Sequence, residues 1–290
     1  MKLATLHTEQ GTTVVSVVDQ DGQLTFYDLR HFDEALPRSL KGVLSLEDGL
    51  ERARQAAEQA EQSNRTITGT LDAPIPKPDK VICIGLNYKD HAEETGMAFP
   101  DEPVCFSKFS TSVTGPDQPI RIPAIAKEVD YEAELVAVIG KTCRNATQAN
   151  ALDYIAGYMN GHDVSARDWQ IGRPGGQWLL GKTADTFAPT GPYLVTSDEI
   201  DDANNLPIKL TLNGEVMQNS CTDKFIFTIE EVIEFVSQFM TLEPGDIIFT
   251  GTPPGVGMAR KPPVYMKPGD QVDVEIQGLG LLHNTVEAWN

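Results

Sequence analysis

Cysteine is scarce in this chain. Its four residues form no Cys-x-x-Cys pair, and no histidine stands at zinc-finger spacing from Cys83, Cys105, Cys143 or Cys221. This pattern excludes a disulfide framework and a zinc finger, and it indicates reduced thiols in a cytoplasmic protein.

Long apolar runs are also missing. None approaches the roughly 18 residues that a membrane-spanning helix needs. Near the N-terminus, Glu9 and Gly11 interrupt the chain before the apolar segment of a signal peptide could form. We therefore expect a soluble protein in the cytoplasm, with no membrane partner.

Positive charge is in deficit. The 290 residues include 23 Lys and Arg against 42 Asp and Glu, a formal net charge of −19. Such a chain repels nucleic acid phosphate and anionic lipid, so we expect no nucleic acid partner. A small anionic substrate is compatible with this charge only if a bound cation, a few basic side chains or backbone N–H groups meet it locally.

The first 72 residues read as a separate small domain. Residues 1–30 alternate apolar and polar positions around Asp21-Gly22, which predicts a hairpin. Helical spacing then predicts a helix over residues 45–62, with Ser45 and Asp48 as a capping box. Three prolines within residues 71–79 predict an extended connector, so we place the domains at 1–72 and 73–290.

The second domain is predicted to be rich in strands. The expected strands are 80–85, 103–109, 131–140, 192–196, 207–213, 246–250 and 271–276. The expected helices are 147–158 and 228–240, the second with Thr228 and Glu231 as a capping box. Gly and Pro clusters between the late strands favour an antiparallel or mixed sheet over a βαβ array. The predicted class is α+β and β-rich, behind a small N-terminal α/β domain.

Three acidic residues suggest a metal site. Glu132 and Glu134 point to the same face of a strand, where two carboxylates repel each other unless a cation lies between them. Asp163 sits in an apolar context and could complete an oxygen site suited to Mg²⁺ or Mn²⁺. The alternatives are a solvated edge strand for the glutamates and a helix-capping or salt-bridge role for the aspartate.

Other candidates for chemistry lie outside this trio. Lys182 is flanked by apolar residues and could bind an anionic substrate oxygen, or else extend along the surface. His91 and Glu94 are spaced i, i+3, so the carboxylate could orient the imidazole as a base on a mobile lid that Gly96 would allow; a surface histidine is the alternative. Residues 249–257 form a Gly-rich turn whose N–H groups could hold a carboxylate, without the pattern of a phosphate loop.

Five motifs in order resemble the fumarylacetoacetate hydrolase family over residues 80–288. They are Gly85-Leu-Asn-Tyr-Lys-Asp-His91, Tyr131-Glu-Ala-Glu-Leu135, His162-Asp-Val-Ser-Ala-Arg-Asp168, Gly181-Lys182 and Phe249-Thr-Gly-Thr-Pro253. The turn after Pro253 is similar to that of the subgroup related to oxaloacetate tautomerases. The resemblance implies a mixed β-roll catalytic domain, homodimeric as a rule.

The resemblance also implies site roles. It assigns Mg²⁺ or Mn²⁺ to Glu132, Glu134 and Asp163, and catalysis to His91, Glu94 and Lys182. It assigns substrate binding to Arg167, Gln170, Thr252, Tyr88 and Lys108. Two departures, Ala184 and Phe109, stand where the family often has an aromatic residue and a proline, and they concern the substrate pocket.

The implied activity acts on a small anionic 2-oxo acid through a metal-stabilised enolate. Hydrolysis of the C–C bond of an acylpyruvate ranks first, because it is the commonest assignment in the family and the His/Glu pair is present. Tautomerisation or decarboxylation of oxaloacetate is the alternative. A non-catalytic protein that binds a small acid is the alternative of another class.

Overall fold

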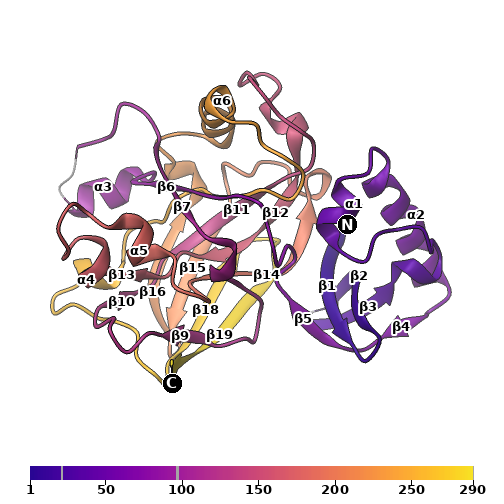
Figure 1. Ribbon diagram of the computed structural model, residues 1–290, viewed down its shortest axis with the longest axis horizontal. Helices are drawn as coiled ribbons and strands as arrows, with labels where there is room; N and C mark the ends of the chain where they lie inside the picture. The colour runs from indigo at the N-terminus through magenta and orange to yellow at the C-terminus, as the bar shows by residue number, and fades with distance from the viewer. Residues whose placement is uncertain (21, 96–97, 290) are drawn as a thin grey trace.

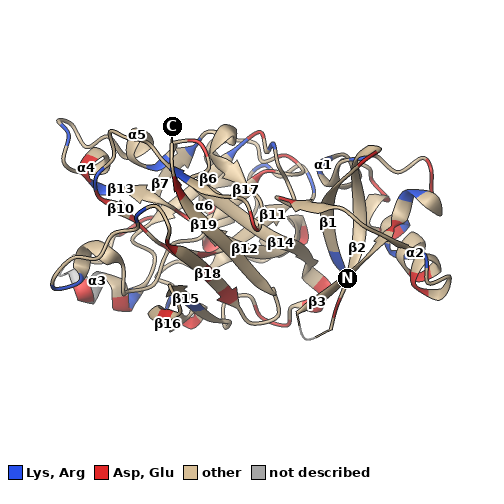
Figure 2. Ribbon diagram, turned by 90° about the horizontal axis from the view of Figure 1, so that it is seen from below, with Lys and Arg blue, Asp and Glu red and all other residues tan. Residues whose placement is uncertain are grey.

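The computed structural model describes residues 1–20, 22–95 and 98–289. In Figure 1 the N-terminal strands and helices, in indigo and purple, lie beside a larger body that holds the rest of the chain. Basic and acidic residues are spread over both parts, as Figure 2 shows. Within the described residues, no helix has the length and apolar character needed to cross a membrane.

The N-terminal part is an antiparallel meander covered by helices. Its elements are β1 (Lys2–Thr8), β2 (Gly11–Gln20), β3 (Gln23–Asp28), η1 (Leu29–His31), α1 (Leu40–Leu44), α2 (Gly49–Gln62), β4 (Thr66–Ile67) and β5 (Thr70–Asp72). The predicted hairpin is present, with Gln20 paired to Gln23. Of the two residues expected at its turn, Asp21 lies outside the described residues.

The helix predicted over residues 45–62 is present as α2, which begins four residues later than expected, at Gly49. The capping box predicted for it is wrong, because Ser45 lies at the end of the preceding helix α1. Asp48 precedes α2 but makes no capping hydrogen bond with its side chain, whereas Ser39 caps α1 by accepting from the Gly42 N–H at 3.1 Å. Periodicity found the buried face of α2, but the turn between the helices carries no Gly or Pro that would mark it beforehand.

The larger part contains most of the strands. They are β6 (Val81–Gly85), β7 (Val104–Lys108), β8 (Val113–Thr114), β9 (Ile120–Ile122), β10 (Val129–Asp130), β11 (Ala133–Ile139), β12 (Ile155–His162), β13 (Ser165–Ala166), β14 (Ala188–Thr196), β15 (Pro207–Leu212), β16 (Glu215–Cys221), β17 (Ile247–Phe249), β18 (Gln271–Ile276) and β19 (Leu281–Ala288). The helices are α3 (Lys89–Thr95), η2 (Ser110–Ser112), η3 (Ala151–Tyr154), α4 (Arg167–Gln170), α5 (Trp178–Lys182), η4 (Ser197–Glu199), η5 (Thr222–Lys224), α6 (Ile229–Phe239) and η6 (Gly257–Ala259).

One long sheet runs through both parts. Its strand order is β4-β3-β2-β1-β14-β12-β11-β17-β6-β7, and β1 joins β14 through the pairs Lys2–Val195 and Leu3–Leu194. Hydrogen bonding therefore continues across the domain boundary predicted at residue 72. The division into 1–72 and 73–290 remains a proposal.

A second sheet packs on the centre of the first. Its order is β16-β15-β18-β19-β9, and β15, β18 and β19 contact β11, β12 and β14, respectively. Leu135 and Ala137 of β11 belong to the core between the sheets, while Val136 and Val138 belong to the core on the other face. Antiparallel pairs predominate, with parallel pairs between β17 and β6, between β14 and β8, and between β19 and β9. The predicted α+β, β-rich class is confirmed.

The helix predicted over residues 147–158 is wrong, and this error bears on the site. Residues Ile155–His162 form β12, which is buried along its whole length between β11 and β14. Gly157 allows β12 to approach β14 closely, because a Cβ there would lie 2.0 Å from the carbonyl oxygen of Val195. A buried central strand has no polar face, so it lacks the alternation that would reveal it. The other predicted helix is confirmed as α6, including its capping box.

Candidate metal and substrate site

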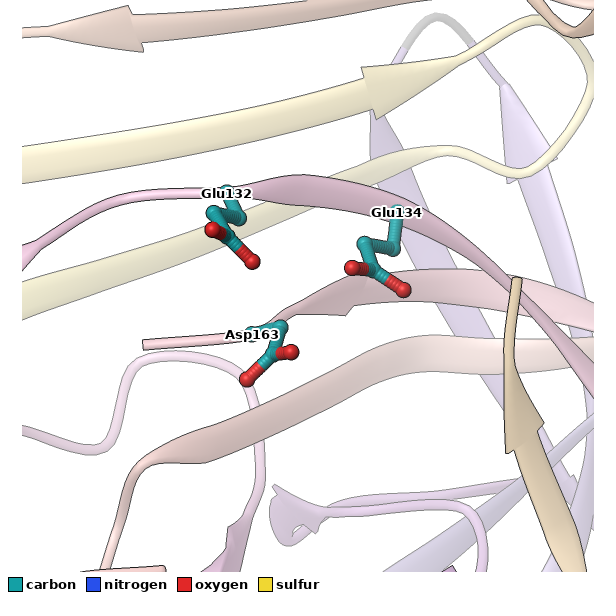
Figure 3. Close-up of side chains that lie close together, drawn as sticks. All are labelled: Glu132, Glu134 and Asp163. Atoms are coloured by element: carbon teal, nitrogen blue, oxygen red, sulfur yellow. The ribbon is translucent and has the colours of Figure 1, made fainter. Parts of the chain in front are cut away.

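The three acidic residues come from adjacent central strands. Glu132 and Glu134 lie at the start of β11, and Asp163 follows β12 directly. The two strands are antiparallel, with Ala133 opposite His162, and the Asp163 N–H donates to the Glu132 carbonyl at 2.9 Å. This register brings the carboxylates together (Figure 3), so that one oxygen from each lies within 4.8 Å of the others.

Two buried lysines flank Asp163 on opposite sides. The Lys182 ammonium donates to Glu132 Oε2 at 2.6 Å and to Asp163 Oδ2 at 2.9 Å. The Lys108 ammonium lies 2.6 Å from Asp163 Oδ1 and also donates to the carbonyls of Val164, Lys182 and Phe187. The three backbone carbonyls use all three protons of the Lys108 ammonium, and its charge supports Asp163. No proton is left to donate to a substrate, the role that the resemblance implied.

Arg167 ties the trio to the next shell of polar residues. Its Nε donates to Asp130 at 2.9 Å, and its terminal nitrogens donate to Gln170 Oε1 at 2.8 Å and to Glu132 Oε1 at 2.6 Å. Asp130 also accepts from the backbone N–H groups of Gly257 and Met258. Sequence reasoning missed Asp130, although its place two residues before Glu132 in a buried strand was a signal.

The carboxylates differ in how their charge is met. Burial by itself would raise the pKa of Glu132, but the charges of Lys182 and Arg167 lower it to about 2. Burial raises the pKa of Glu134 well above its usual value, and the negative charges of Asp163 and Glu132 raise it further. Glu134 therefore lacks a sufficient cationic partner among the protein's own groups. Three converging carboxylates with one undercompensated charge fit a hard divalent cation such as Mg²⁺ or Mn²⁺.

A cavity of about 520 Å³ opens onto this group. Glu132, Glu134 and Lys182 line it, together with Arg167 and Gln170. A larger cavity of about 970 Å³ lies between β7 and α6. Its lining is mainly apolar, and it contains none of the three acidic residues, so the chemistry is placed in the smaller cavity.

His91 and Glu94 lie on α3 and also line the smaller cavity. His91 Nδ1 is 3.3 Å from Glu94 Oε2, and Glu94 also accepts from the Gly255 N–H at 3.1 Å. These contacts lower the pKa of Glu94 although partial burial opposes the shift. Gly96, on which the idea of a mobile lid depended, lies outside the described residues.

Thr252 and Tyr88 do not present free groups to the cavity. The Thr252 hydroxyl donates to the Ala133 carbonyl at 2.9 Å and accepts from Gln218 at 2.9 Å, so its hydrogen-bonding capacity is largely used. Tyr88 is fully buried against Phe225 and is not among the residues that line the cavity. Beside Thr252, the Gly251 N–H donates to Glu134 Oε2 at 2.8 Å, so this turn binds a carboxylate of the protein itself.

Several cavity residues were not found from the sequence. Phe106 and Trp178 form an edge-to-face pair at 5.4 Å, and the Lys182 ammonium lies 5.1 Å from the centre of the Phe106 ring. Lys261 also lines the cavity. Its only signal was its place in the Lys261-Pro-Pro sequence directly after the Gly-rich turn, which does not by itself indicate a ligand.

The chain belongs to the fumarylacetoacetate hydrolase family, and it is an enzyme of that family. The family described as fumarylacetoacetate (FAA) hydrolase C-terminal matches residues 80–287, so the resemblance seen in the sequence is confirmed. A Xenopus laevis relative named oxaloacetate tautomerase fahd2, mitochondrial, is 49% identical over 271 residues, covering 92% of this chain and 84% of the relative. A Rattus norvegicus relative named oxaloacetate tautomerase Fahd2a, mitochondrial, is 51% identical over 261 residues, covering 89% and 83%.

Solved structures share the fold. The fumarylacetoacetate hydrolase (EaFAH) from Exiguobacterium antarcticum matches with a TM-score of 0.84 and 35% identity, covering 100% of both chains.

The predicted cytoplasmic location is wrong. The relatives from Xenopus laevis, rat, cattle and human are named as mitochondrial proteins. The prediction rested on cysteine usage and on the lack of long apolar runs and of a signal-peptide pattern. Neither observation tells one reducing compartment from another.

Proposed function

We propose that this protein is a divalent-metal-dependent oxaloacetate tautomerase, an isomerase that moves a proton between C3 and the keto oxygen of the substrate. The observation that carries the proposal is the convergence of Glu132, Glu134 and Asp163 beside Lys182, at a cavity that both glutamates and the lysine line. The names of the Xenopus and rat relatives support this reaction over acylpyruvate hydrolysis, which the sequence had placed first.

Glu132, Glu134 and Asp163 would hold the ion, Mg²⁺ or Mn²⁺. The ion would supply a Lewis acid for the keto oxygen of a 2-oxo acid, which favours enolisation at the neighbouring carbon. The chain itself keeps these carboxylates ready for a cation, because Lys182, Lys108 and Arg167 hold Glu132 and Asp163 in place.

Lys182, Arg167 and Gln170 are proposed to bind the 2-oxo acid end of the substrate. The Lys182 ammonium uses two of its three protons on Glu132 and Asp163, and so retains one donor for a substrate oxygen. Gln170 accepts from Arg167 through Oε1, which leaves its amide N–H groups to donate to a carboxylate. Thr252 and its turn would support this pocket through Glu134.

His91 is proposed to move the C3 proton. Its Nδ1 faces Glu94, so in the neutral imidazole with a proton on Nδ1 the basic nitrogen is Nε2. Glu94 fixes the ring orientation and stabilises the imidazolium that forms when Nε2 takes the proton. The same pair could activate a water, which keeps C–C hydrolysis as the second candidate reaction.

One panel of substrates tests the proposal. Purified protein with Mg²⁺ is incubated with oxaloacetate, acetylpyruvate and fumarylpyruvate, while enol absorbance and released products are followed. We expect accelerated keto–enol exchange of oxaloacetate, with no pyruvate beyond the spontaneous rate. Cleavage of acetylpyruvate or fumarylpyruvate without tautomerisation of oxaloacetate would restore hydrolysis as the function, and enzyme-dependent release of CO₂ would indicate decarboxylation. The homodimeric state implied by the resemblance is part of the same proposal, and light scattering measures it.

A further inference from the structure

Lys261 differs from the other basic side chains of the cavity. Arg167 and Lys182 are buried and each is paired with two carboxylates, and His91 is paired with Glu94. Lys261 is exposed, and no carboxylate of the described residues lies within salt-bridge distance of its ammonium. It is therefore the cavity cation whose charge the described part of the protein does not meet.

The loop that carries Lys261 is fixed in place. The Gly251 N–H donates to Glu134 at 2.8 Å, and the N–H groups of Gly257 and Met258 donate to Asp130 at 2.6 and 3.0 Å. Arg260, directly before Lys261, donates to the Met217 carbonyl at 2.7 Å. The backbone at Lys261 is thus fixed relative to the acidic trio. When an anion binds, only the side chain of Lys261 has to become ordered.

Charge balance indicates what such an anion would be. The buried cluster contains four carboxylates, of Asp130, Glu132, Glu134 and Asp163, and three cations, of Lys108, Arg167 and Lys182. Its net charge is minus one, and a divalent ion would make it plus one. A monoanionic 2-oxo acid would neutralise that charge, whereas a dianion needs one more positive group. Lys261 is such a group, on the same cavity.

We propose that Lys261 binds the carboxylate of the substrate that lies farthest from the 2-oxo acid end, and so selects dicarboxylates. For oxaloacetate, this group is the C4 carboxylate. The inference rests on the proposed tautomerase function and deepens it: the buried residues bind the 2-oxo acid group common to many substrates, and Lys261 recognises the second acidic group.

The test compares Lys261→Ala, Lys261→Arg and the wild-type protein. Lys267→Ala is the matched control, because this lysine is also exposed, lies six positions further along the chain and does not line the cavity. Steady-state tautomerisation of oxaloacetate gives KM and kcat. Inhibition by oxalate gives a second readout, since this two-carbon acid mimics the 2-oxo acid end and has no carboxylate beyond it. Calorimetric titration with Mg²⁺ reports on the metal site.

In Lys261→Ala we expect KM for oxaloacetate to rise by about 10-fold or more, as for the loss of one charge-assisted hydrogen bond. The kcat, the inhibition constant of oxalate and the Mg²⁺ affinity should each stay within about twofold of wild type, and Lys261→Arg should restore most of the loss in KM.

An unchanged KM in Lys261→Ala, or an equal weakening of oxalate and oxaloacetate, would overturn the role of Lys261 while leaving tautomerisation intact. If the wild-type protein itself does not convert oxaloacetate, the proposed function is overturned and the role of Lys261 falls with it.

Discussion

The charged side chains of the site form two groups that differ in burial. We call Glu132, Glu134, Asp163, Lys108 and Lys182, which are all buried, the buried wall. We call His91, Glu94 and Lys261 the open rim, in which His91 is buried but Glu94 and Lys261 are exposed. Side chains of Asp163 and Lys108 in the wall are 0% exposed, whereas that of Glu94 in the rim is 29% exposed.

This difference separates two kinds of function. A buried charge has little water to stabilise it, so each group in the wall depends on its partners, and removing one affects folding as well as ion binding. A charge on the rim keeps its solvent and can be changed at small cost in stability. We therefore expect substitutions in the wall to alter stability and metal affinity, and those in the rim to alter turnover and selectivity.

The largest effect is expected from Lys108→Met. Methionine fills a similar volume, but it removes the positive charge that lies 2.6 Å from Asp163 Oδ1 and leaves three backbone carbonyls without their donor. Breaking a buried pair by removing one partner costs about 3–5 kcal/mol. Chemical denaturation should show a loss of this size in the free energy of unfolding.

The control for Lys108→Met is Lys209→Met. Lys209 pairs with Glu275 at 2.6 Å, the same separation as Lys108 and Asp163, but both side chains are more than 40% exposed. We expect this control to lose about 1 kcal/mol or less. Equal losses for the two variants would erase the distinction between wall and surface.

Glu134→Gln should have the next largest effect. The amide keeps the shape of the side chain and can still accept from the Gly251 N–H, but it removes the charge that an ion would bind. We expect the Mg²⁺ affinity measured by calorimetry to fall by about 100-fold, at least as much as for the loss of a supporting residue around a metal.

In EDTA, the same variant should melt no lower than wild type. Burial and the neighbouring carboxylates raise the pKa of Glu134, which means that folding disfavours its charge when no cation is bound. Glu275→Gln, a substitution of an exposed glutamate, serves as the control. Retention of wild-type Mg²⁺ affinity by Glu134→Gln would remove this residue from the metal site.

Glu94→Gln tests whether a substitution in the open rim changes turnover without changing stability. We expect kcat to fall by about 10-fold, equivalent to one weakened charge-assisted hydrogen bond, with the melting temperature at neutral pH close to that of wild type. Without the carboxylate, the orientation of the His91 ring is no longer fixed, so the loss should appear in kcat with KM little changed. Steady-state assays with oxaloacetate measure both constants, and an unchanged kcat would argue against the His91–Glu94 pair as the base.

Stability against pH gives the smallest effect. Folding lowers the pKa of Glu94, so its contacts stabilise the protein above the unfolded value near 4.5 and are lost as the pH falls through the folded value. Wild type should therefore exceed Glu94→Gln in free energy of unfolding at pH 7, and this difference should be smaller at pH 4. Because the residue is partly exposed, we expect the difference to decrease by less than about 1 kcal/mol. Denaturation curves at the two pH values measure it.

The sequence predicted the acidic trio well, for a physical reason. Glu132 and Glu134 are two residues apart on a strand, and side-chain alternation alone places them on one face. Asp163 needed a long-range contact, and here the correct residue was chosen with the wrong local structure, since it follows a buried strand instead of a helix. The family motif supplied what periodicity did not.

The depth of a lysine could not be predicted from its neighbours. Lys182 and Lys108 both stand among apolar or small residues, yet the first reaches the cavity and the second is enclosed behind Asp163. That difference depends on α5 packing over β7, segments more than 70 positions apart. For the same reason, the sequence did not reveal that Asp130 binds Arg167, Gly257 and Met258, or that Lys261 lines the cavity. Both depend on contacts between segments that are far apart in the chain.

Asp130 has a consequence for the geometry of the cavity as a whole. Each of its carboxylate oxygens accepts two hydrogen bonds, from Tyr131 and Gly257 on one oxygen and from Met258 and Arg167 on the other. The buried wall and the loop of Lys261 are therefore fastened to a single anion that is not among the residues lining the cavity. Through these hydrogen bonds, a residue that the substrate would not contact fixes the distance between the acidic trio and the backbone at Lys261.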